Sequence, residues 1–232
     1  LNIARERNTL VNCNFRHNGV ALRLGWNKPG YGREQMQANE NRFFGCNFVE
    51  NGYAYTDEES QENGFVEIWY SEHPVFVGGT WKSNFNPVII SATSAAIFDG
   101  IYLENLDGGK IPRYGSRAFI ILNARNASIY TNCFAAAIRC VSFRNCNIGS
   151  FNHIALRAGV VDGYQYHIDG VTFDNCEWGR NSGFLYADGE EAFIHNIRVT
   201  GRTGDRREKL ASNVAYAQEL TTAPPQYKMV FP

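Results

Sequence analysis

The fold is decided by an eight-residue stretch with a cysteine at its sixth position, which recurs along the chain. The four clearest copies read NTLVNCNF at 8–15, NRFFGCNF at 41–48, VSFRNCNI at 141–148 and VTFDNCEW at 171–178. Three looser copies read GTWKSNFN at 79–86, IYLENLDG at 101–108, with Leu106 in the cysteine position, and IRVTGRTG at 197–204. The copies start roughly 22 to 40 residues apart, a spacing that indicates a solenoid or repeat array.

Apolar and polar residues alternate within each copy. Val171 and Phe173 alternate with Thr172 and Asp174, and this period of two is typical of a β-strand. Further strands are predicted at VALRL 20–24, FVEIWY 65–70, VIIS 88–91, FIIL 119–122, HIALRA 153–158 and FLYAD 184–188. A third segment leads back into the next copy, and its clearest pair is FDG at 98–100 and IDG at 168–170.

Three short strands per repeat, joined by loops of varying length, predict an all-β fold. The architecture we expect is a single-stranded right-handed parallel β-helix, a solenoid of about seven coils. Residues 1–204 are assigned to this domain. The repeat stops after Gly204, so residues 205–232 are predicted to form a C-terminal cap or a linker, with a short helix over 205–220.

The asparagines and cysteines of the repeat have a structural interpretation. Asparagine precedes the cysteine position at 12, 105, 145 and 175, and it tolerates the left-handed backbone that a tight corner needs. We expect Cys13, Cys46, Cys146 and Cys176 to point inward at one shared corner, and all six cysteines to be free thiols. Because no CxxC pair or histidine cluster accompanies them, no metal site and no cofactor are predicted.

Charged residues in the aligned copies fall opposite one another on neighbouring strands. Such pairs stabilise a sheet by roughly 0.2–1 kcal/mol, so we interpret them as structural ladders rather than as catalytic groups. The opposed residues are Lys82 with Glu104, Arg144 with Asp174, and Arg139 with Asp169 and His195.

Composition excludes several classes of function. Hydrophobic residues make up 44% of the 232 residues, which is enough for a sizeable core. With 22 Lys plus Arg against 23 Asp plus Glu the net charge is -1, so the chain has no basic field to attract nucleic acid. No run of about 18 apolar residues occurs and the first ten residues lack the apolar core of a signal peptide, so we expect no membrane insertion.

The repeated frames resemble the pectate-lyase-like parallel β-helix superfamily, and within it the tailspike and appendage proteins of bacteriophages. The resemblance rests on the N-C-N-F and F-x-N-C frames, on the F-D-G and I-D-G returns, and on the richness in Asn, Gly and aromatic residues, and it covers about residues 8–204. It implies polysaccharide binding or cleavage, assembly as a homotrimer, and a place in the virion acting at the host cell surface. The R-x-x-x-P-x-x-R element of pectate lyases is missing from the sequence, so a calcium-dependent lyase mechanism is not carried over.

Loop lengths predict a groove on the solenoid surface. About 16 residues at 49–64 and about 15 at 104–118 connect one predicted strand to the next, whereas the coil between them, which contains Trp81, has almost no loop. Because coils repeat at about 4.8 Å, two tall loops on either side of a bare coil would enclose a groove on the order of 10 Å wide, which suits a sugar chain.

The groove supplies the candidate site residues. Alternation should place Val66 and Ile68 inward and Glu67 and Trp69 outward. Carboxylates that could act in catalysis are Glu67, Glu72, Asp57 and Glu58. Residues that could bind the substrate are Trp69, Tyr53, Tyr55, Trp81, Lys110, Arg113, Tyr114 and Arg117.

Two interpretations remain open for these residues. Trp69 could instead be buried against a loop or a neighbouring subunit, and the acidic run at 57–59 could be a solvated loop tip. Glu67 aligns with Arg23 and Ile89, so a second catalytic carboxylate would have to come from a loop. The sequence therefore indicates either a carbohydrate-active enzyme, a glycoside hydrolase or a polysaccharide lyase, or a non-enzymatic structural or receptor-binding module of a larger viral appendage.

Overall fold

The computed structural model describes ten segments of the chain. These segments are 1–25, 38–52, 64–84, 88–104, 118–123, 138–148, 153–161, 164–178, 185–187 and 193–199. They contain 25 β-strands and, within these ranges, no α-helix. The prediction of an all-β fold is therefore confirmed.

Most of the strands lie in three sheets in which every neighbouring pair is parallel. Sheet A contains β1 (Asn2–Ile3), β4 (Leu22–Leu24), β7 (Val66–Trp69), β10 (Val88–Ser91), β13 (Ala118–Asn123), β17 (His153–Arg157) and β23 (Leu185–Ala187). Sheet B contains β2 (Thr9–Val11), β5 (Arg42–Phe44), β8 (Val75–Val77), β11 (Ile97–Asp99), β15 (Ser142–Arg144), β21 (Thr172–Asp174) and β25 (Arg198–Val199). Sheet C contains β3 (Asn14–Arg16), β6 (Asn47–Val49), β9 (Thr80–Lys82), β12 (Tyr102–Glu104), β16 (Asn147–Ile148) and β22 (Glu177–Trp178).

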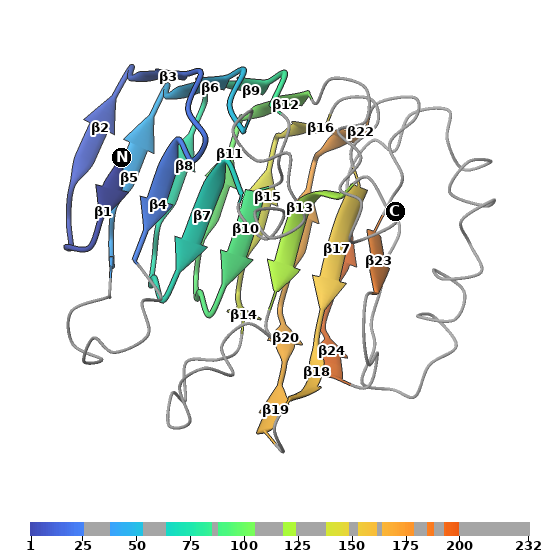
Figure 1. Ribbon diagram of the computed structural model, residues 1–232. Coiled ribbons are helices and arrows are strands. Elements are labelled where there is room, and N and C mark those ends of the chain that lie inside the picture. The colour runs from blue at the N-terminus through green and yellow to red at the C-terminus, as the bar shows by residue number, and fades with distance from the viewer. Residues whose placement is uncertain are drawn as a thin grey trace.

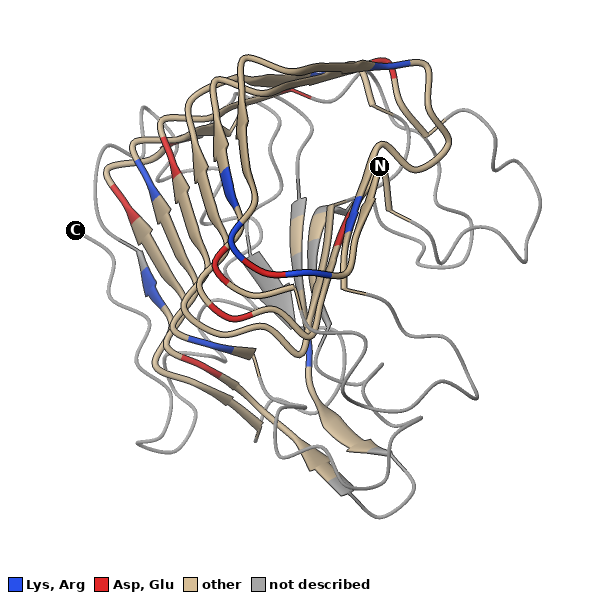
Figure 2. Ribbon diagram, turned by 90° about the vertical axis from the view of Figure 1, so that its left-hand side faces the viewer, with Lys and Arg blue, Asp and Glu red and all other residues tan. Residues whose placement is uncertain are grey.

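The chain passes through the three sheets in turn, and each of the first six passes adds one strand to each sheet (Figure 1). Viewed along the stack from the N-terminal end, the passes surround a common interior (Figure 2). This arrangement of parallel strands in stacked sheets is compatible with a parallel β-helix. All six strands predicted from 20–24 to 184–188 lie in sheet A.

Two smaller sheets complete the described part. Sheet D contains the parallel strands β14 (Ile138–Arg139), β20 (Ile168–Asp169) and β24 (Ile194–His195). A hairpin of β18 (Gly159–Val161) and β19 (Tyr164–Tyr166) is antiparallel and was not predicted. It extends away from the three stacked sheets next to sheet D (Figure 1).

Like aromatic rings stack on one another through the interior. In sheet B, Phe43, Phe76, Phe98, Phe143 and Phe173 face one another in register, with neighbouring ring centroids between 4.6 and 5.1 Å apart. Each of these rings is at most 2% exposed. Stacking of aromatic rings adds to the free energy gained by burying them.

The corner between sheets B and C contains the predicted row of cysteines. Cys46, Cys146 and Cys176 are at most 2% exposed, and the half-buried Cys13 packs against the same core. The preceding residue has a left-handed backbone in each copy, with φ of 52° at Asn12, 60° at Gly45, and 51° at both Asn145 and Asn175. The predicted shared corner is confirmed.

Burial and hydrogen bonding shift the pKa values of the thiols of this corner in different directions. Burial raises the pKa of Cys46. The hydrogen bond between Cys146 and Cys176, together with burial, raises the pKa of Cys176, whereas the same bond lowers the pKa of Cys146. Cys13, Cys46, Cys140, Cys146 and Cys176 are all free, which agrees with the prediction for five of the six cysteines, while Cys133 lies outside the described segments.

Two of the looser copies were aligned wrongly from the sequence, each by five residues. Phe76 pairs with Phe43 and Phe98 pairs with Phe143, so the frames are 74–81 and 96–103 instead of 79–86 and 101–108. Ile101, not Leu106, therefore occupies the cysteine position. The error arose because Gly79 stands where the other copies have cysteine, and the alternation alone could not fix the register.

The proposed return segments are also not equivalent. Phe98 belongs to β11 in sheet B, whereas Ile168 belongs to β20 in sheet D and pairs with Ile138 and Ile194. Asn105, Leu106 and the predicted helix over 205–220 lie outside the described residues.

Candidate functional site

The best-defined candidate site lies on the outward face of sheet A. Alternation along β7 places Val66 and Ile68 inside, both 0% exposed, and turns Glu67 to the other face, as predicted. Glu67 pairs in register with Arg23 on one side and Ile89 on the other, which confirms the predicted neighbours.

Glu67 is nevertheless buried, with only 2% of its surface exposed. Its Oε2 accepts from Arg23 Nε at 2.5 Å and from Trp69 Nε1 at 3.3 Å, and its Oε1 accepts from the backbone N–H of Gly64 at 3.0 Å. A buried charge is stable only when a counter-charge and further hydrogen bonds replace its lost water, and here three donors do so. Glu67 is therefore a tightly held carboxylate.

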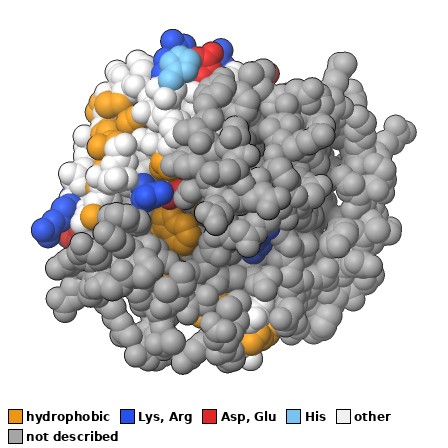
Figure 3. Space-filling view, in the orientation of Figure 1, with side chains coloured by type: hydrophobic (Ala, Val, Ile, Leu, Met, Phe, Trp, Pro, Cys, Tyr) orange, Lys and Arg blue, Asp and Glu red, His pale blue; other side chains and the backbone are white. Residues whose placement is uncertain are grey.

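Trp69 lies two residues along the same strand and on the same face. Its side chain is half-buried and packs against the core, and its indole N–H is directed at Glu67. Two alternatives were predicted for this ring, an exposed platform or a buried contact, and the half-buried position lies between them. In Figure 3, which views this side of the molecule, basic, acidic and apolar side chains lie next to one another near the centre.

Trp81 is not part of this surface. Its indole is 1% exposed and meets Phe65, Phe76 and Phe98 edge to face at interplanar angles of 81° to 83°. Its inclusion among the substrate-binding residues was wrong, because the corrected frame puts Trp81 at the inward position that Phe48 occupies in the pass before.

Glu72 lies apart from Glu67. The chain turns at Tyr70, which has a φ of 47°, and Glu72 then forms an isolated bridge to Ser94. Glu72 is exposed, and its backbone N–H donates to Asn39 Oδ1 at 2.9 Å. Glu67 and Glu72 thus do not share a ladder of the sheet.

The remaining predicted site residues lie outside the described part of the chain. They are Tyr53, Tyr55, Asp57, Glu58, Lys110, Arg113, Tyr114 and Arg117. The order of strands on which the groove was argued does hold, because β9, which contains Trp81, lies between β6 and β12 in sheet C. The two loops follow β6 and β12, and the short connection after β9 leads to β10.

The predicted charge ladders are confirmed. Figure 2 shows basic and acidic residues following one another across neighbouring strands. The register pairs Lys82 with Glu104, Arg144 with Asp174, and Asp169 with both Arg139 and His195.

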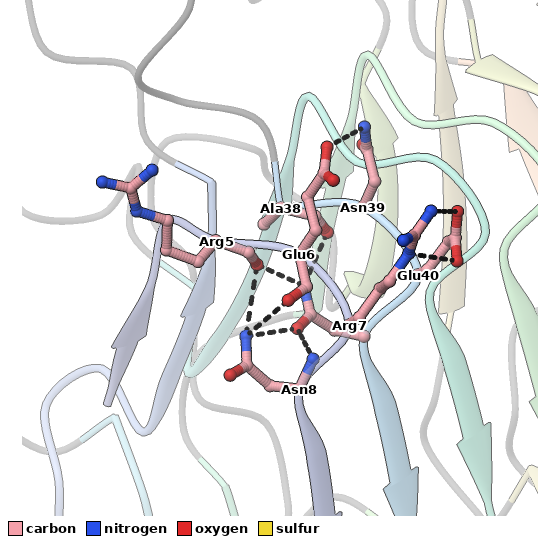
Figure 4. Close-up of polar contacts among 8 residues, drawn as sticks. Arg5, Glu6, Arg7, Asn8, Ala38, Asn39 and Glu40 are labelled. Carbon is pink, nitrogen blue, oxygen red and sulfur yellow. Dashed lines mark hydrogen bonds and ion pairs between the residues drawn. The ribbon is translucent and has the colours of Figure 1, made fainter.

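A further ion pair lies at the corner between sheets A and B. Arg7 Nε is 3.0 Å from Glu40 Oε2. One residue earlier on both strands, Asn39 Nδ2 donates a hydrogen bond to Glu6 Oε1 (Figure 4). The guanidinium of Arg7 lowers the pKa of Glu40. Both side chains are largely exposed, so the pair contributes little to stability.

Two polar features were missed in the sequence. The first is a pocket of about 410 Å³ lined by Asn145, Cys146, Asn147, Asn175 and Glu177. Among these residues Asn175 Nδ2 donates to Asn145 Oδ1 at 2.8 Å, a bond between stacked asparagines that their repeated position predicts, and Asn147 Nδ2 donates to Glu177 Oε2 at 3.2 Å. The repeated asparagine on both sides of the cysteine was the signal for it.

The second missed feature is a histidine pair. His167 Nδ1 lies 3.2 Å from His195 Nε2, and burial with the nearby His195 and Arg139 lowers the pKa of His167. The sequence alignment placed His195 in one row with Arg139 and Asp169 and left out His167. His167 lies two residues before Asp169, the residue that pairs with His195.

Comparison with known proteins gives no assignment: no family model, curated protein or solved structure matches the chain. Within the segments described above, no helix has the length and apolar character needed to cross a membrane.

Proposed function

We propose that the chain is a right-handed parallel β-helix of about seven coils and forms part of a viral tailspike-like appendage that recognises a host surface polysaccharide. The right hand is supported by the strong preference of parallel strand crossovers for that hand. The repeat of parallel strands in sheets A, B and C supports the β-helix. The viral setting, at the virion surface, rests on the sequence resemblance alone.

The observation that carries recognition of a glycan is the position of Trp69 beside Glu67 on the outward face of sheet A. An indole offers a flat apolar face to a sugar ring. The bond from Trp69 Nε1 to Oε2 of the buried Glu67 would hold that indole in a fixed orientation.

The environment of Glu67 favours binding without cleavage by this residue. A general acid must hold a proton and reach the glycosidic oxygen. Both carboxylate oxygens of Glu67 already accept hydrogen bonds, from Arg23, Trp69 and Gly64, and its side chain is buried, so it is poorly placed to reach a glycosidic oxygen. Cleavage would then depend on the other candidates, Glu72, Asp57 or Glu58.

A non-enzymatic structural or receptor-binding module is the second candidate. The half-buried position of Trp69 favours it, because a ring packed against the core has less surface to offer a ligand. Assembly as a homotrimer fits either function. It is supported by three exposed apolar side chains in one row on the outward face of sheet B, Val11, Phe44 and Val77, which are 57%, 36% and 37% exposed.

The test measures binding of purified bacterial surface polysaccharides to the intact assembly, together with the appearance of new reducing ends or unsaturated uronate absorbance. We expect Trp69→Ala to weaken binding because the stacking surface is lost. Tyr102→Ala is the matched control, since Tyr102 is an exposed aromatic residue of sheet C, 38% exposed.

The outcomes separate the two functions. Glu67→Gln keeps the shape of the side chain, so cleavage lost with binding retained would assign a catalytic role to Glu67. Binding lost only in Trp69→Ala would support a recognition module. If Trp69→Ala and Tyr102→Ala bind every polysaccharide as well as the parent, sheet A is not the glycan site.

A further inference from the structure

The strongest unassigned feature is the pair of histidines at the edge of sheet D. Ile168 pairs with Ile194 and Asp169 with His195, so His167 and His195 project from neighbouring parallel strands. Positions 167 and 169 of one strand, and 193 and 195 of the other, share a face because strand side chains alternate. Both imidazoles are half-buried.

The geometry of the two rings suits a shared metal ion. The ring centroids are 5.4 Å apart with an interplanar angle of 21°, and His167 Nδ1 is 3.2 Å from His195 Nε2. Two imidazole nitrogens that bind one tetrahedral zinc ion at about 2.0–2.1 Å lie about 3.3–3.4 Å from each other. The observed separation is close to that edge of the tetrahedron.

We propose that His167 Nδ1 and His195 Nε2 together bind one late first-row divalent metal ion, with Zn²⁺ as the representative ion. Imidazole is a preferred ligand of zinc, copper and nickel, whereas calcium and magnesium prefer oxygen. The described residues contain no group of three or more His, Cys, Asp and Glu that could hold a metal. The site therefore supplies two protein ligands and leaves the other positions to water or to a donor from outside the chain.

The neighbours of the pair orient it and set its charge. The Phe193 ring meets His167 edge to face at 5.1 Å, which restricts rotation of the imidazole. Asp169 lies directly across from His195 and accepts from Asn196 Nδ2 at 2.7 Å, so a carboxylate is fixed beside the pair. Arg139 faces Asp169 from the other side, and its positive charge opposes a bound cation. These charges predict modest affinity that depends on Arg139.

The alternative is a plain hydrogen bond between two neutral imidazoles, which the same distance also permits. A titration of the full-length chain with zinc chloride distinguishes the metal site from the hydrogen bond. Binding is measured by calorimetry and by the imidazole signals in NMR spectra. We expect binding of one ion that shifts the signals of His167 and His195, with no competition from calcium or magnesium chloride.

Four variants make the test specific. His167→Gln and His195→Gln should each lower the affinity for zinc by at least about tenfold. Loss of a residue that only hydrogen-bonds a metal ligand already costs about that much, so loss of a ligand itself should cost no less. Arg139→Gln should tighten binding, because it removes a like charge. His17→Gln, which changes an exposed histidine paired with Glu50 elsewhere, should leave the affinity unchanged.

Cys140→Ser tests another possible ligand, since Cys140 is an exposed free thiol that follows Arg139 directly. Its affinity should equal that of the parent. The proposal is overturned if no zinc binds, if both histidine variants bind zinc as tightly as the parent while their circular dichroism is unchanged, or if binding is lost in Cys140→Ser alone. The proposal is also overturned if zinc leaves the imidazole signals of His167 and His195 unshifted in the parent, whatever the variants do.

Discussion

Gly79 lies directly against the backbone carbonyl of Cys46 in the neighbouring pass. A Cβ atom added at Gly79 would come within 2.2 Å of the Cys46 oxygen and 2.9 Å of its carbonyl carbon, and Gly79 has a φ of 99°. Neither the contact nor the backbone angle admits a side chain. This glycine allows the corner between sheets B and C to continue where no cysteine is present.

Replacing this glycine tests the corner. We expect Gly79→Ala to destabilise the fold by at least about 1–3 kcal/mol, because both the clash and the left-handed backbone have to be relieved. Gly78→Asn is the matched control. Gly78 has a φ of 64°, nothing lies within 4 Å of its added Cβ, and asparagine occupies the equivalent position at 12, 145 and 175. Urea unfolding measures both, and equal stability of the two variants would contradict the account.

The buried ion pair of sheet A gives a second prediction. Arg23→Met leaves the Glu67 carboxylate buried without its counter-charge, so we expect a loss of about 3–5 kcal/mol in the free energy of unfolding. The double variant Arg23→Met/Glu67→Met removes both charges and should recover most of that loss. Arg7→Ala breaks an exposed ion pair and should change the midpoint of urea unfolding very little. A double variant that is less stable than Arg23→Met would count against the pair as the cause.

Thiol accessibility gives a third prediction. Under native conditions Cys140, which is exposed, should react first with a thiol reagent, whereas Cys46, Cys146 and Cys176 should react only as the chain unfolds. Under denaturing, non-reducing conditions the count should be six. A count of four or fewer free thiols in protein kept from air would show that disulfides form and would contradict this prediction.

The ion pair of Arg7 and Glu40 predicts a measurable titration. Since Arg7 lowers the folded-state pKa of Glu40, its contribution to stability is present above the unfolded pKa and is lost as pH falls through the folded one. NMR titration of the Glu40 carboxyl should give a midpoint below that of an ordinary glutamate. Arg7→Ala should return the midpoint toward the ordinary value, and so should high salt. A midpoint that Arg7→Ala does not move would assign the shift to another group.

Much of the fold could be predicted because the repeat encodes it in a period of two. The alternation around Phe173 and Val66 fixed which side chains point inward, and the aligned charges gave register pairs such as Arg144 with Asp174. The frames at 79 and 101 failed because the third pass has Gly79 and the fourth has Ile101 in place of cysteine. Their register is revealed by the pairing of Phe76 with Phe43 and of Phe98 with Phe143.

The candidate site was less predictable for a physical reason. Alternation shows which face a residue takes but not what covers that face, so Glu67 was correctly turned outward and its burial was missed. The His167 pair was missed because its members differ by two positions in the register, and an alignment of copies compares only residues at the same position.

The early passes also share one period, which has a consequence for the size of the molecule. Hydrogen bonds join Asn8 to Asn41, Asn18 to Asn51, and Asn51 to Asn84, each across 33 residues. Left-handed corners recur in step at Asn12, Gly45 and Gly78. A whole unit could therefore be duplicated or deleted in a gene without disturbing the contacts of its neighbours, and each unit would change the length of the molecule by about 4.8 Å, the spacing of adjacent strands. The length of such a protein can therefore evolve in fixed increments, while the side chains on its lateral surfaces stay the same.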